Sequence, residues 1–368
     1  MLYDFGKEIL VITVSLCMIV KNEEQNIQRC LNSVLGVVDE IIIVDTGSTD
    51  KTKELCFKYT EKVYDFAWIN DFSAARNYAY SFATMDYILW LDADDIIMID
   101  DRSNFIELKN TLDTTIDVIM MKYNTGIDIR GNVVFSYYRE RLTKRERNYK
   151  WMEPVHEYIE TFGTVINSDI GITHGKIMGK EHNTRNIKIY ENIIKKKIPL
   201  TPRGNYYYAR ELKDHGRFSD SAKQFEKFLD SNSGWREDNI SACSELAKCY
   251  LKLGDGNKAL GAMYRSFIYD IPRAEVCCQI GYYFQEKGDY KRAAFWFEFI
   301  LTLKKPDNVW GFLQHDCWDF IPYLECAVCY DKLGEKEKAE EYNTKALQFK
   351  PHSTQALLNQ KYFNQIKV

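Results

Sequence analysis

The sequence predicts an α/β domain with a mostly parallel sheet, followed by an all-α repeat array. In the first half, branched apolar runs alternate with segments whose apolar residues recur at helical spacing. That alternation is typical of parallel strands joined by right-handed helical crossovers. In the second half, glycines recur at positions 216, 254, 288 and 334, each with a small residue seven positions earlier. Such self-similarity is typical of stacked helical hairpins.

The composition is that of an ordinary globular protein. Of the 368 residues, 45% are hydrophobic and 28% are charged, which is enough for a sizeable core. The formal net charge of −4 gives no electrostatic case for nucleic acid as the main partner. The longest apolar run, residues 9–20, is too short to span a membrane. The ten cysteines are scattered, so we expect reduced core thiols and a cytoplasmic location.

The first half divides into short strands and helices. Strands are predicted at residues 13–20, 40–44, 61–64, 87–91 and 117–123, and a hairpin at 127–137 turns through residues 131–132. Helices are predicted after the first three strands, where apolar residues return at helical spacing. Ser48 or Thr49 is expected to cap the second helix, and Asp71 or Ser73 the third.

The strand at residues 87–91 is followed by three carboxylates, Asp92, Asp94 and Asp95. Carboxylates this close raise one another's pKa and resist ionising together. A divalent cation removes that conflict, and Mg²⁺ or Mn²⁺ keeps open positions for a phosphorylated substrate. The alternative is a solvated acidic turn in which Asp94 or Asp95 caps the segment that follows.

Polar residues also follow the other strands. Asn22 and Glu23 come after the first strand, Asp45 ends the second, and Arg76 lies on the third helix. In open parallel sheets, ligands bind beyond the carboxyl ends of the strands. We therefore expect a pocket for a nucleoside diphosphate at this edge. Taken singly, Asp45 is compatible with a turn, Arg76 with a helix surface, and Glu23 with a helix N-terminus.

Four motifs carry a resemblance to a known family. They are CMIVKNE at 17–23, VDTGSTD at 44–50, DFSAARN at 71–77 and LDAD at 91–94. In order and spacing they resemble the family 2 glycosyltransferases, which have the A-type, Rossmann-like fold. The resemblance implies inverting transfer from a nucleotide sugar, most often a UDP-sugar, with Mn²⁺ or Mg²⁺.

The resemblance also implies roles for individual residues. Asp94 is expected to be the main metal ligand, with Asp92 and His156 completing the metal shell. Asp45 is expected to hold the uracil or ribose, and Arg76 to lie near the diphosphate. The residues expected to bind the donor are Val20, Asn22, Glu23, Asp45, Arg76 and Asp92.

The reaction also needs a base. Departure of a diphosphate calls for cationic charge neutralisation, and the acceptor must lose a proton. The base is Glu157, Glu153 or His156, because His156 and Glu157 match a subfamily pattern and strand register decides which residue faces the pocket. In the preceding basic stretch, otherwise a solvated face, Arg141 is expected to contact an anion. His174 is expected to face solvent at a strand end.

The second half resembles tetratricopeptide repeats, with an insertion at residues 308–318 and a capping helix from residue 353. The expected domains are residues 1–180 for the nucleotide sugar, 181–202 as a linking helix, and 203–368 for the repeats.

Repeat arrays of this kind usually bind peptides or proteins, so a polypeptide acceptor is favoured. We expect transfer of GlcNAc or Glc to Ser or Thr, or to Cys, of a secreted peptide or a flagellin-like surface protein. One alternative is a glycolipid or lipopolysaccharide-core acceptor, against which the lack of a basic amphipathic helix argues. Another is a non-catalytic repeat-protein adaptor, against which the intact carboxylates argue. We also expect no membrane span, and a homodimer formed through the repeats.

Overall fold

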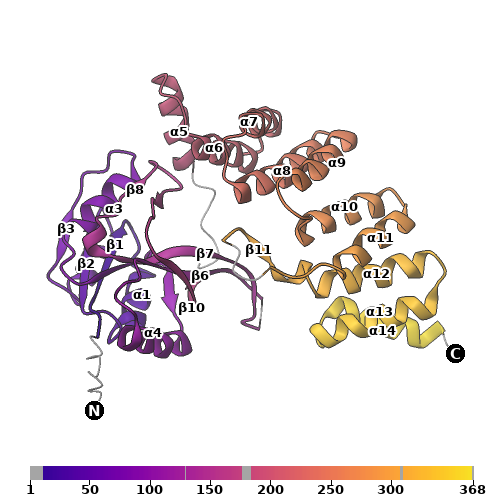
Figure 1. Cartoon of the computed structure of the whole chain (residues 1–368), viewed down its shortest axis with the longest axis horizontal. Helices are drawn as coiled ribbons and strands as arrows, with labels where there is room; N and C mark the ends of the chain where they lie inside the picture. The colour runs from indigo at the N-terminus through magenta and orange to yellow at the C-terminus, as the bar shows by residue number, and fades with distance from the viewer. Residues whose placement is uncertain (1–10, 129, 176–183, 307–309, 367–368) are drawn as a thin grey trace, which may run out of the picture. The chain divides into compact units, whose positions relative to one another are not determined.

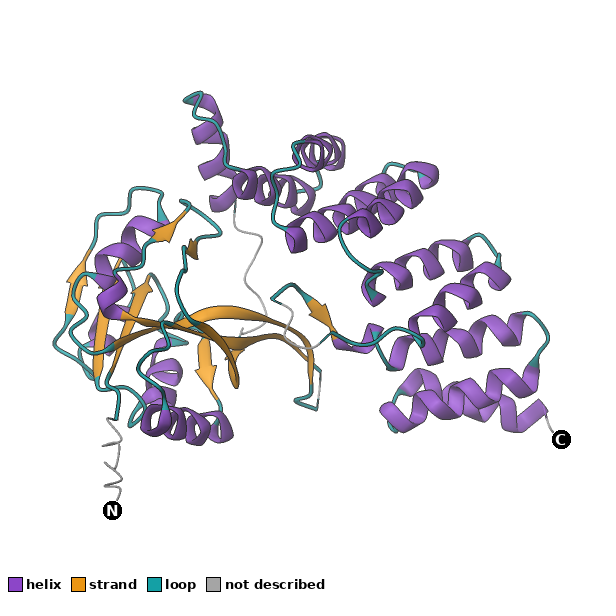
Figure 2. Cartoon of the chain, in the orientation of Figure 1, coloured by secondary structure: helices purple, strands orange, loops and turns teal. Residues whose placement is uncertain are grey.

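The structure is a computed structural model that describes residues 11–128, 130–175, 184–306 and 310–366 (Figure 1). The chain divides into two compact units. The first contains residues 1–127 and 136–189, and the second contains residues 128–135 and 190–368. The first unit holds a mixed sheet with helices on both faces, and the second is built mainly of helices packed one after another (Figure 2). The expected domain boundary at residue 180 lies outside the described residues.

The sheet of the first unit is mostly parallel in its N-terminal half, as predicted. Its strands follow the order β3-β2-β1-β4-β7-β6-β10-β5. Strand β1 pairs in parallel with β2 and β4, and β6 with β10, whereas β4–β7 and β10–β5 are antiparallel. The strands along this order are β1 (Val14–Val20), β2 (Glu40–Asp45), β3 (Val63–Asp65), β4 (Tyr87–Trp90), β5 (Asp95–Ile97), β6 (Val118–Ile127), β7 (Val133–Lys144) and β10 (Val165–His174). Strands β8 (Trp151–Met152) and β9 (Tyr158–Ile159) form a small separate sheet.

Alternation along β1 sorts its side chains between the two faces of the sheet. Leu16 packs in one core cluster with Ile27 of α1 (Ile27–Val34) and Phe105 of α4 (Ile99–Thr111). Cys17 points the other way and joins Ala79 of α3 (Phe72–Tyr80). In Figure 1, α3 therefore lies above the sheet, and α1 and α4 lie below it.

Local capping was predicted correctly at one helix and wrongly at another. Asp71 caps α3, because its carboxylate accepts from the backbone N–H of Ala74. The cap predicted at Ser48 or Thr49 is wrong, since α2 (Thr52–Cys56) starts later along the chain. The Ser48 hydroxyl instead accepts from the backbone N–H of Asn22, which ties the two loops together.

The prediction of a solvated basic stretch after the hairpin is wrong for the part that precedes residue 145. Strand β7 continues to Lys144, so alternate side chains turn inward. The side chain of Arg139 is 20% exposed. Arg141, the expected exception, is 0% exposed and contacts the carboxylate of Asp95 at 2.9 Å.

The second unit has the predicted repeat architecture. Gly216, Gly254, Gly288 and Gly334 each follow the first helix of a pair with φ between 73° and 84°, a conformation that favours glycine. A Cβ on Gly281 would lie 2.7 Å from the ring of Phe297, so only glycine allows the packing of α10 on α11. The helices are α5 (Arg185–Lys195), α6 (Pro202–Asp214), α7 (Phe218–Asp230), α8 (Arg236–Lys252), α9 (Gly256–Arg265), α10 (Ala274–Glu286), α11 (Tyr290–Ile300), α12 (Phe320–Lys332), α13 (Lys336–Phe349) and α14 (Thr354–Ile366).

The predicted insertion lies between α11 and α12, and its described part contains the short strand β11 (Leu313–Gln314). The predicted capping helix is α14. Across the described ranges, every helix is too short or too polar to cross a bilayer. All ten cysteines are buried and free.

Candidate active site

The polar residues predicted to converge do meet at one edge of the sheet. Strands β1, β2 and β4 run in parallel, with Val20 opposite Asp45 and Cys17 opposite Trp90. Their carboxyl ends therefore open on the same side, and Asp92 follows β4 directly. The topology thus brings three segments far apart in the sequence to one edge.

Asp45 closes a tight turn at the end of β2 with one carboxylate oxygen, and its other oxygen has no hydrogen-bond partner among the described residues. Its Oδ1 accepts from the backbone N–H groups of Gly47 and Ser48, both at 2.8 Å. The residue is 3% exposed, and its Oδ2 is buried without a hydrogen-bond partner among the described residues. A buried acceptor of this kind costs free energy unless a donor reaches it. The imide of a pyrimidine base or a ribose hydroxyl carries such a donor.

The loop after β1 is tied to the loop after β2. The amide oxygen of Asn22, a residue with φ of 53°, accepts from the backbone N–H of Thr49 at 2.8 Å. The backbone N–H of Glu23 donates to the hydroxyl of Thr52 at 2.6 Å. Val20 lies in the core at 3% exposure, so its side chain serves packing. The predicted contacts of these residues with a nucleotide stay predictions.

Arg76 joins the end of β4 to the segment after β8. Its Nη2 donates to Asp92 and its Nε to Glu157, both at 2.7 Å, while its guanidinium lies over the rings of Trp90 and Trp151. Burial alone would lower the pKa of Arg76, but the two carboxylates raise it above its ordinary value. The guanidinium is 6% exposed. It therefore holds two acidic side chains in place.

The three candidate bases lie on one short, strained loop. Glu153 has a φ of 72° and His156 a φ of 56°, a conformation that is rare outside glycine and is often found at functional sites. Burial would raise the pKa of Glu157, but the charge of Arg76 and its hydrogen bond lower that pKa below its ordinary value. Glu157 is thus a poor proton acceptor, because its carboxylate is stabilised in the charged form.

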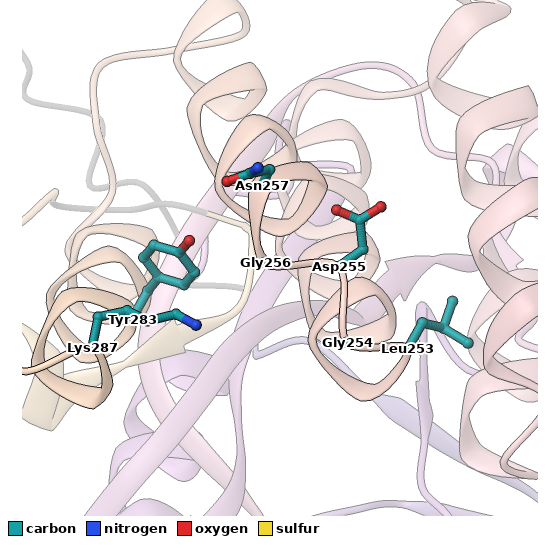
Figure 3. Close-up of a pocket in the computed structure, with 7 residues that line it drawn as sticks. All are labelled: Leu253, Gly254, Asp255, Gly256, Asn257, Tyr283 and Lys287. Carbon is teal, nitrogen blue, oxygen red and sulfur yellow. The ribbon is translucent and has the colours of Figure 1, made fainter.

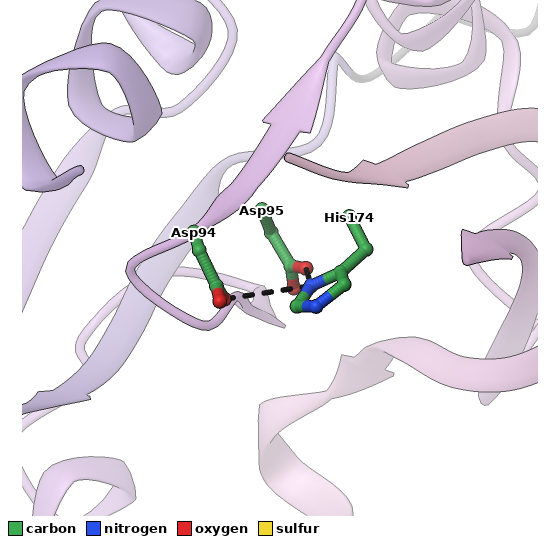
Figure 4. Close-up of side chains that lie close together, drawn as sticks. All are labelled: Asp94, Asp95 and His174. Carbon is green, nitrogen blue, oxygen red and sulfur yellow. Dashed lines mark ion pairs between the residues drawn. The ribbon is translucent and has the colours of Figure 1, made fainter. Parts of the chain in front are cut away.

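Asp94 lies in a group of side chains with the chemistry of a metal site (Figure 4). His174 Nδ1 is 3.6 Å from Asp94 Oδ1 and 3.8 Å from Asp95 Oδ1. One ligand atom from each of the three residues lies within 4.8 Å of the others. Burial, followed by the neighbouring carboxylates, raises the pKa of Asp94. The nearby carboxylate of Asp95, and then the charge of Asp94, raise the pKa of His174 against the opposing effect of burial.

This group shares only Asp94 with the metal shell predicted from the sequence. Asp92 and His156 are not members of it, and their predicted role as ligands stays a prediction. The prediction that His174 faces solvent is wrong, since its side chain is 24% exposed and its ring contacts the hydroxyl of Tyr123. The register between β10 and β5 pairs His174 with Asp95, 79 positions away in the sequence. The one sequence signal was the place of His174 at a strand end.

The second unit has a pocket of its own, with a volume of about 440 Å³ (Figure 3). It lies at the turn between α8 and α9, and Tyr283 and Lys287 of α10 form its other wall. The remaining lining residues are Leu253, Gly254, Asp255, Gly256 and Asn257. None of the predicted site residues lines it.

Comparison with known proteins recognises the same two parts of the chain. Residues 15–170 match the model of glycosyl transferase family 2, and residues 274–306 and 323–353 match that of a tetratricopeptide repeat. The chain is 29% identical over 215 residues to the SPbeta prophage-derived glycosyltransferase SunS of Bacillus subtilis, which is 54% of this chain and 49% of the relative. It is 37% identical over 149 residues to a TPR repeat-containing protein of Synechococcus elongatus, which is 40% of this chain and 35% of that protein.

The chain thus spans between a third and a half of the length of these two curated relatives. Among solved structures, the C-terminal part of a TPR repeat-containing protein from Cytophaga hutchinsonii aligns with 49% of this chain and 65% of its own, at 19% identity and a TM-score of 0.41.

Proposed function

We propose that this chain transfers a sugar from a UDP-sugar to a side chain of a protein or peptide, with inversion at the sugar carbon. The proposal starts from the match of residues 15–170 to glycosyl transferase family 2 and from the tetratricopeptide repeats that follow. GlcNAc or Glc is the favoured sugar, and the hydroxyl of Ser or Thr, or the thiol of Cys, is the favoured acceptor. The reaction takes place in the cytoplasm, in keeping with ten free, buried cysteines.

One observation carries the proposal: acidic residues at the carboxyl edge of the parallel strands have carboxylate oxygens that could bind a cation or accept a hydrogen bond from a ligand. Asp94 lies 3.6 Å from His174, and burial together with the neighbouring carboxylates raises its pKa. On the same edge, Asp45 Oδ2 is buried without a partner among the described residues. The first feature suits a divalent cation, and the second suits a base or ribose donor.

In this proposal Asp94 and His174 hold Mn²⁺ or Mg²⁺, with Asp95 as the third member of the group. We keep Asp92 as a proposed further ligand, as expected from the sequence. Two oxygen ligands and one imidazole nitrogen are acceptable to Mn²⁺. When bound, the cation supplies positive charge to the departing diphosphate. Asp45 orients the nucleoside, and the loops fastened through Asn22 and Glu23 shape the pocket around the base.

The remaining task is to take the proton of the acceptor. Glu157 is bound to Arg76 and has a lowered pKa, so its part is to orient Arg76. We assign the base to Glu153 or His156, because both lie on the strained loop and Glu157 is bound to Arg76. An imidazole or a carboxylate can each act as a general base at neutral pH.

The repeats are the proposed site of acceptor binding. Stacked helical hairpins present an extended surface of the kind that binds peptides.

The first test is release of UDP from a panel of UDP-sugars by the purified chain, with and without Mn²⁺. We expect release with one sugar and at least a tenfold loss on adding EDTA. Asp94→Ala should lose this activity, whereas Asp169→Ala should keep it, because that side chain is 91% exposed on the first unit. Mn²⁺-dependent release that survives Asp94→Ala would disprove the metal assignment.

A second pair of variants distinguishes the proposed metal-ligand role of His174 from the proposed base role of His156. His174→Gln should raise the Mn²⁺ concentration for half-maximal UDP release about tenfold or more, as expected when a ligand or its close partner is lost. His156→Gln should leave that concentration unchanged and lower the rate of transfer to an acceptor. Intact-mass analysis of co-expressed candidate peptides then tests the acceptor class, and a sugar found only on lipid would refute the peptide acceptor.

A further inference from the structure

Arg141 and Asp95 form an ion pair that is closed off from solvent beside the candidate metal ligands. The exposed fraction of both side chains is 0%. Arg141 Nη1 donates to Asp95 Oδ2 at 2.9 Å and to the carbonyl oxygen of Trp90 at 3.1 Å. A buried ion pair often stabilises a protein no more than apolar side chains of the same volume would. Stability alone therefore gives a weak reason for placing this pair here.

The pair closes the turn that carries Asp94. Asp95 Oδ2 also accepts from the backbone N–H of Asp92 at 3.0 Å, and the backbone N–H of Asp95 donates to the carbonyl of Asp92 at 3.0 Å. These two bonds join the ends of a short turn with Asp94 inside it. The carbonyl oxygen of Asp94 accepts from the backbone N–H of Gly175 at 2.7 Å, directly after His174.

Two aromatic rings fix the guanidinium of Arg141. Its Cζ lies 3.8 Å from the ring centroid of Trp90 and 4.4 Å from that of Tyr123. The hydroxyl of Tyr123 in turn lies 3.1 Å from His174 Nδ1. The same tyrosine thus touches both the buried arginine and the candidate metal ligand, and the position of one constrains the position of the other.

The pair is also incompletely satisfied. Among the described residues, Arg141 Nε and Nη2 and Asp95 Oδ1 have no hydrogen-bond partner. Buried ion pairs that serve stability need good hydrogen bonds to their remaining polar atoms. This pair lacks several such hydrogen bonds. Its existing hydrogen bonds go to the backbone of Trp90 on β4 and of Asp92 in the turn before Asp94.

We propose that Arg141 is a positioning residue of the active site. By binding Asp95 it holds the turn at residues 92–95 and sets the carboxylate of Asp94 beside His174. This inference rests on the proposed metal-dependent function. Lysine is a poor substitute, because an ammonium group is a point charge and lacks the flat face that stacks between two rings.

The test uses the double variant Arg141→Met with Asp95→Asn in the full chain, together with Arg141→Lys, which leaves Asp95 in place, because Asp95 is itself a member of the candidate metal group. Both charges are removed together, so no unpaired charge is left buried. Asparagine keeps an oxygen that accepts from the backbone N–H of Asp92, and methionine keeps an unbranched chain between the rings. A matched control is Arg147→Met, which breaks the ion pair to Asp117, another buried carboxylate of the first unit that is not part of the site.

We expect the double variant to be folded, with a melting temperature close to that of the wild type in the absence of metal. The Mn²⁺ concentration for half-maximal UDP release should rise about tenfold or more. The kcat should fall by a similar factor, while KM for the UDP-sugar changes less than about threefold, because the nucleoside pocket is left intact. The increase in melting temperature that Mn²⁺ and UDP produce in the wild type should shrink. Arg147→Met should keep the Mn²⁺ dependence of the wild type.

The conservative variant Arg141→Lys covers the case in which the double variant does not fold. It retains the charge, and we expect Mn²⁺ dependence between that of the wild type and that of the double variant. Wild-type Mn²⁺ dependence and kcat in the folded double variant, or in Arg141→Lys, would show that the pair is only structural. A wild-type chain that neither releases UDP nor responds to Mn²⁺ would overturn the proposed function itself, and this inference with it.

Discussion

Replacing Arg76 tests whether its guanidinium holds both Asp92 and Glu157 in place. The guanidinium makes two charged hydrogen bonds of 2.7 Å, to Asp92 and to Glu157, and lies over the rings of two tryptophans. Breaking a buried ion pair by removing one partner costs about 3–5 kcal/mol. We expect Arg76→Met to destabilise the first unit by about 4 kcal/mol, in the middle of that range.

The two partners should not contribute equally. The side chain of Glu157 is 13% exposed, whereas that of Asp92 is 38% exposed and is therefore screened by water. A charged hydrogen bond contributes about 1.5–3 kcal/mol when buried, and less when solvent reaches it. Double-mutant cycles should thus give a coupling energy of about 2 kcal/mol for Arg76 with Glu157, and about 1 kcal/mol or less for Arg76 with Asp92.

The assay is urea denaturation at pH 7 of the wild type, Arg76→Met, Glu157→Gln, Asp92→Asn and the two double variants. Tryptophan fluorescence follows unfolding, because Trp90 and Trp151 contact the guanidinium. Four other tryptophans lie in the second unit, so the transition of the first unit is the one that Arg76→Met shifts. A coupling to Asp92 that equals or exceeds the coupling to Glu157 would refute the reasoning from burial.

Three further predictions concern stability. Burial opposes the charged form of Glu40, but hydrogen bonds from Lys62, Ser15 and Thr84 lower its pKa to about 2. The stabilisation of the folded state by ionised Glu40 is therefore complete above about pH 4.5 and is lost as the pH falls toward 2. Glu40→Gln should cost at most about 3 kcal/mol in urea at pH 7, and clearly less at pH 3. Gly281→Ala should lower the free energy of unfolding by about 1–3 kcal/mol through overpacking. In the matched change Gly261→Ala nothing lies within 4 Å of the new Cβ, so thermal melting should show a free energy of unfolding that is higher by about 0.5–1 kcal/mol.

The third of these concerns the nucleoside pocket. Gly47 has a φ of 100°, so Gly47→Ala should cost about 1–2 kcal/mol in urea. It should also weaken UDP binding, measured by calorimetry, because it disturbs the turn that Asp45 holds. Unchanged binding of UDP would show that this turn lies outside the nucleoside pocket.

Periodic features of this chain could be read from the sequence. The strands from β1 to β4, the helix cap at Asp71 and the four anchor glycines are each specified by residues close together in the chain. The meeting of Asp45 and Asp92 at one edge could also be predicted, because parallel connection places successive strand ends on the same side.

Only the tertiary structure decided which side chains face one another across the site. His174 reaches Asp94 because β10 pairs with β5 in one particular register, and a shift of one residue would turn the imidazole to the other face. Arg141 was expected to contact an anion within an otherwise solvated basic stretch, but only the structure shows that this anion is Asp95 and that both side chains are 0% exposed, because β7 continues through that stretch. Glu157 is neutralised by Arg76, 81 positions away. A sequence carries the local preferences, whereas burial and charge pairing at a site depend on distant strands and become visible only when those strands are placed together.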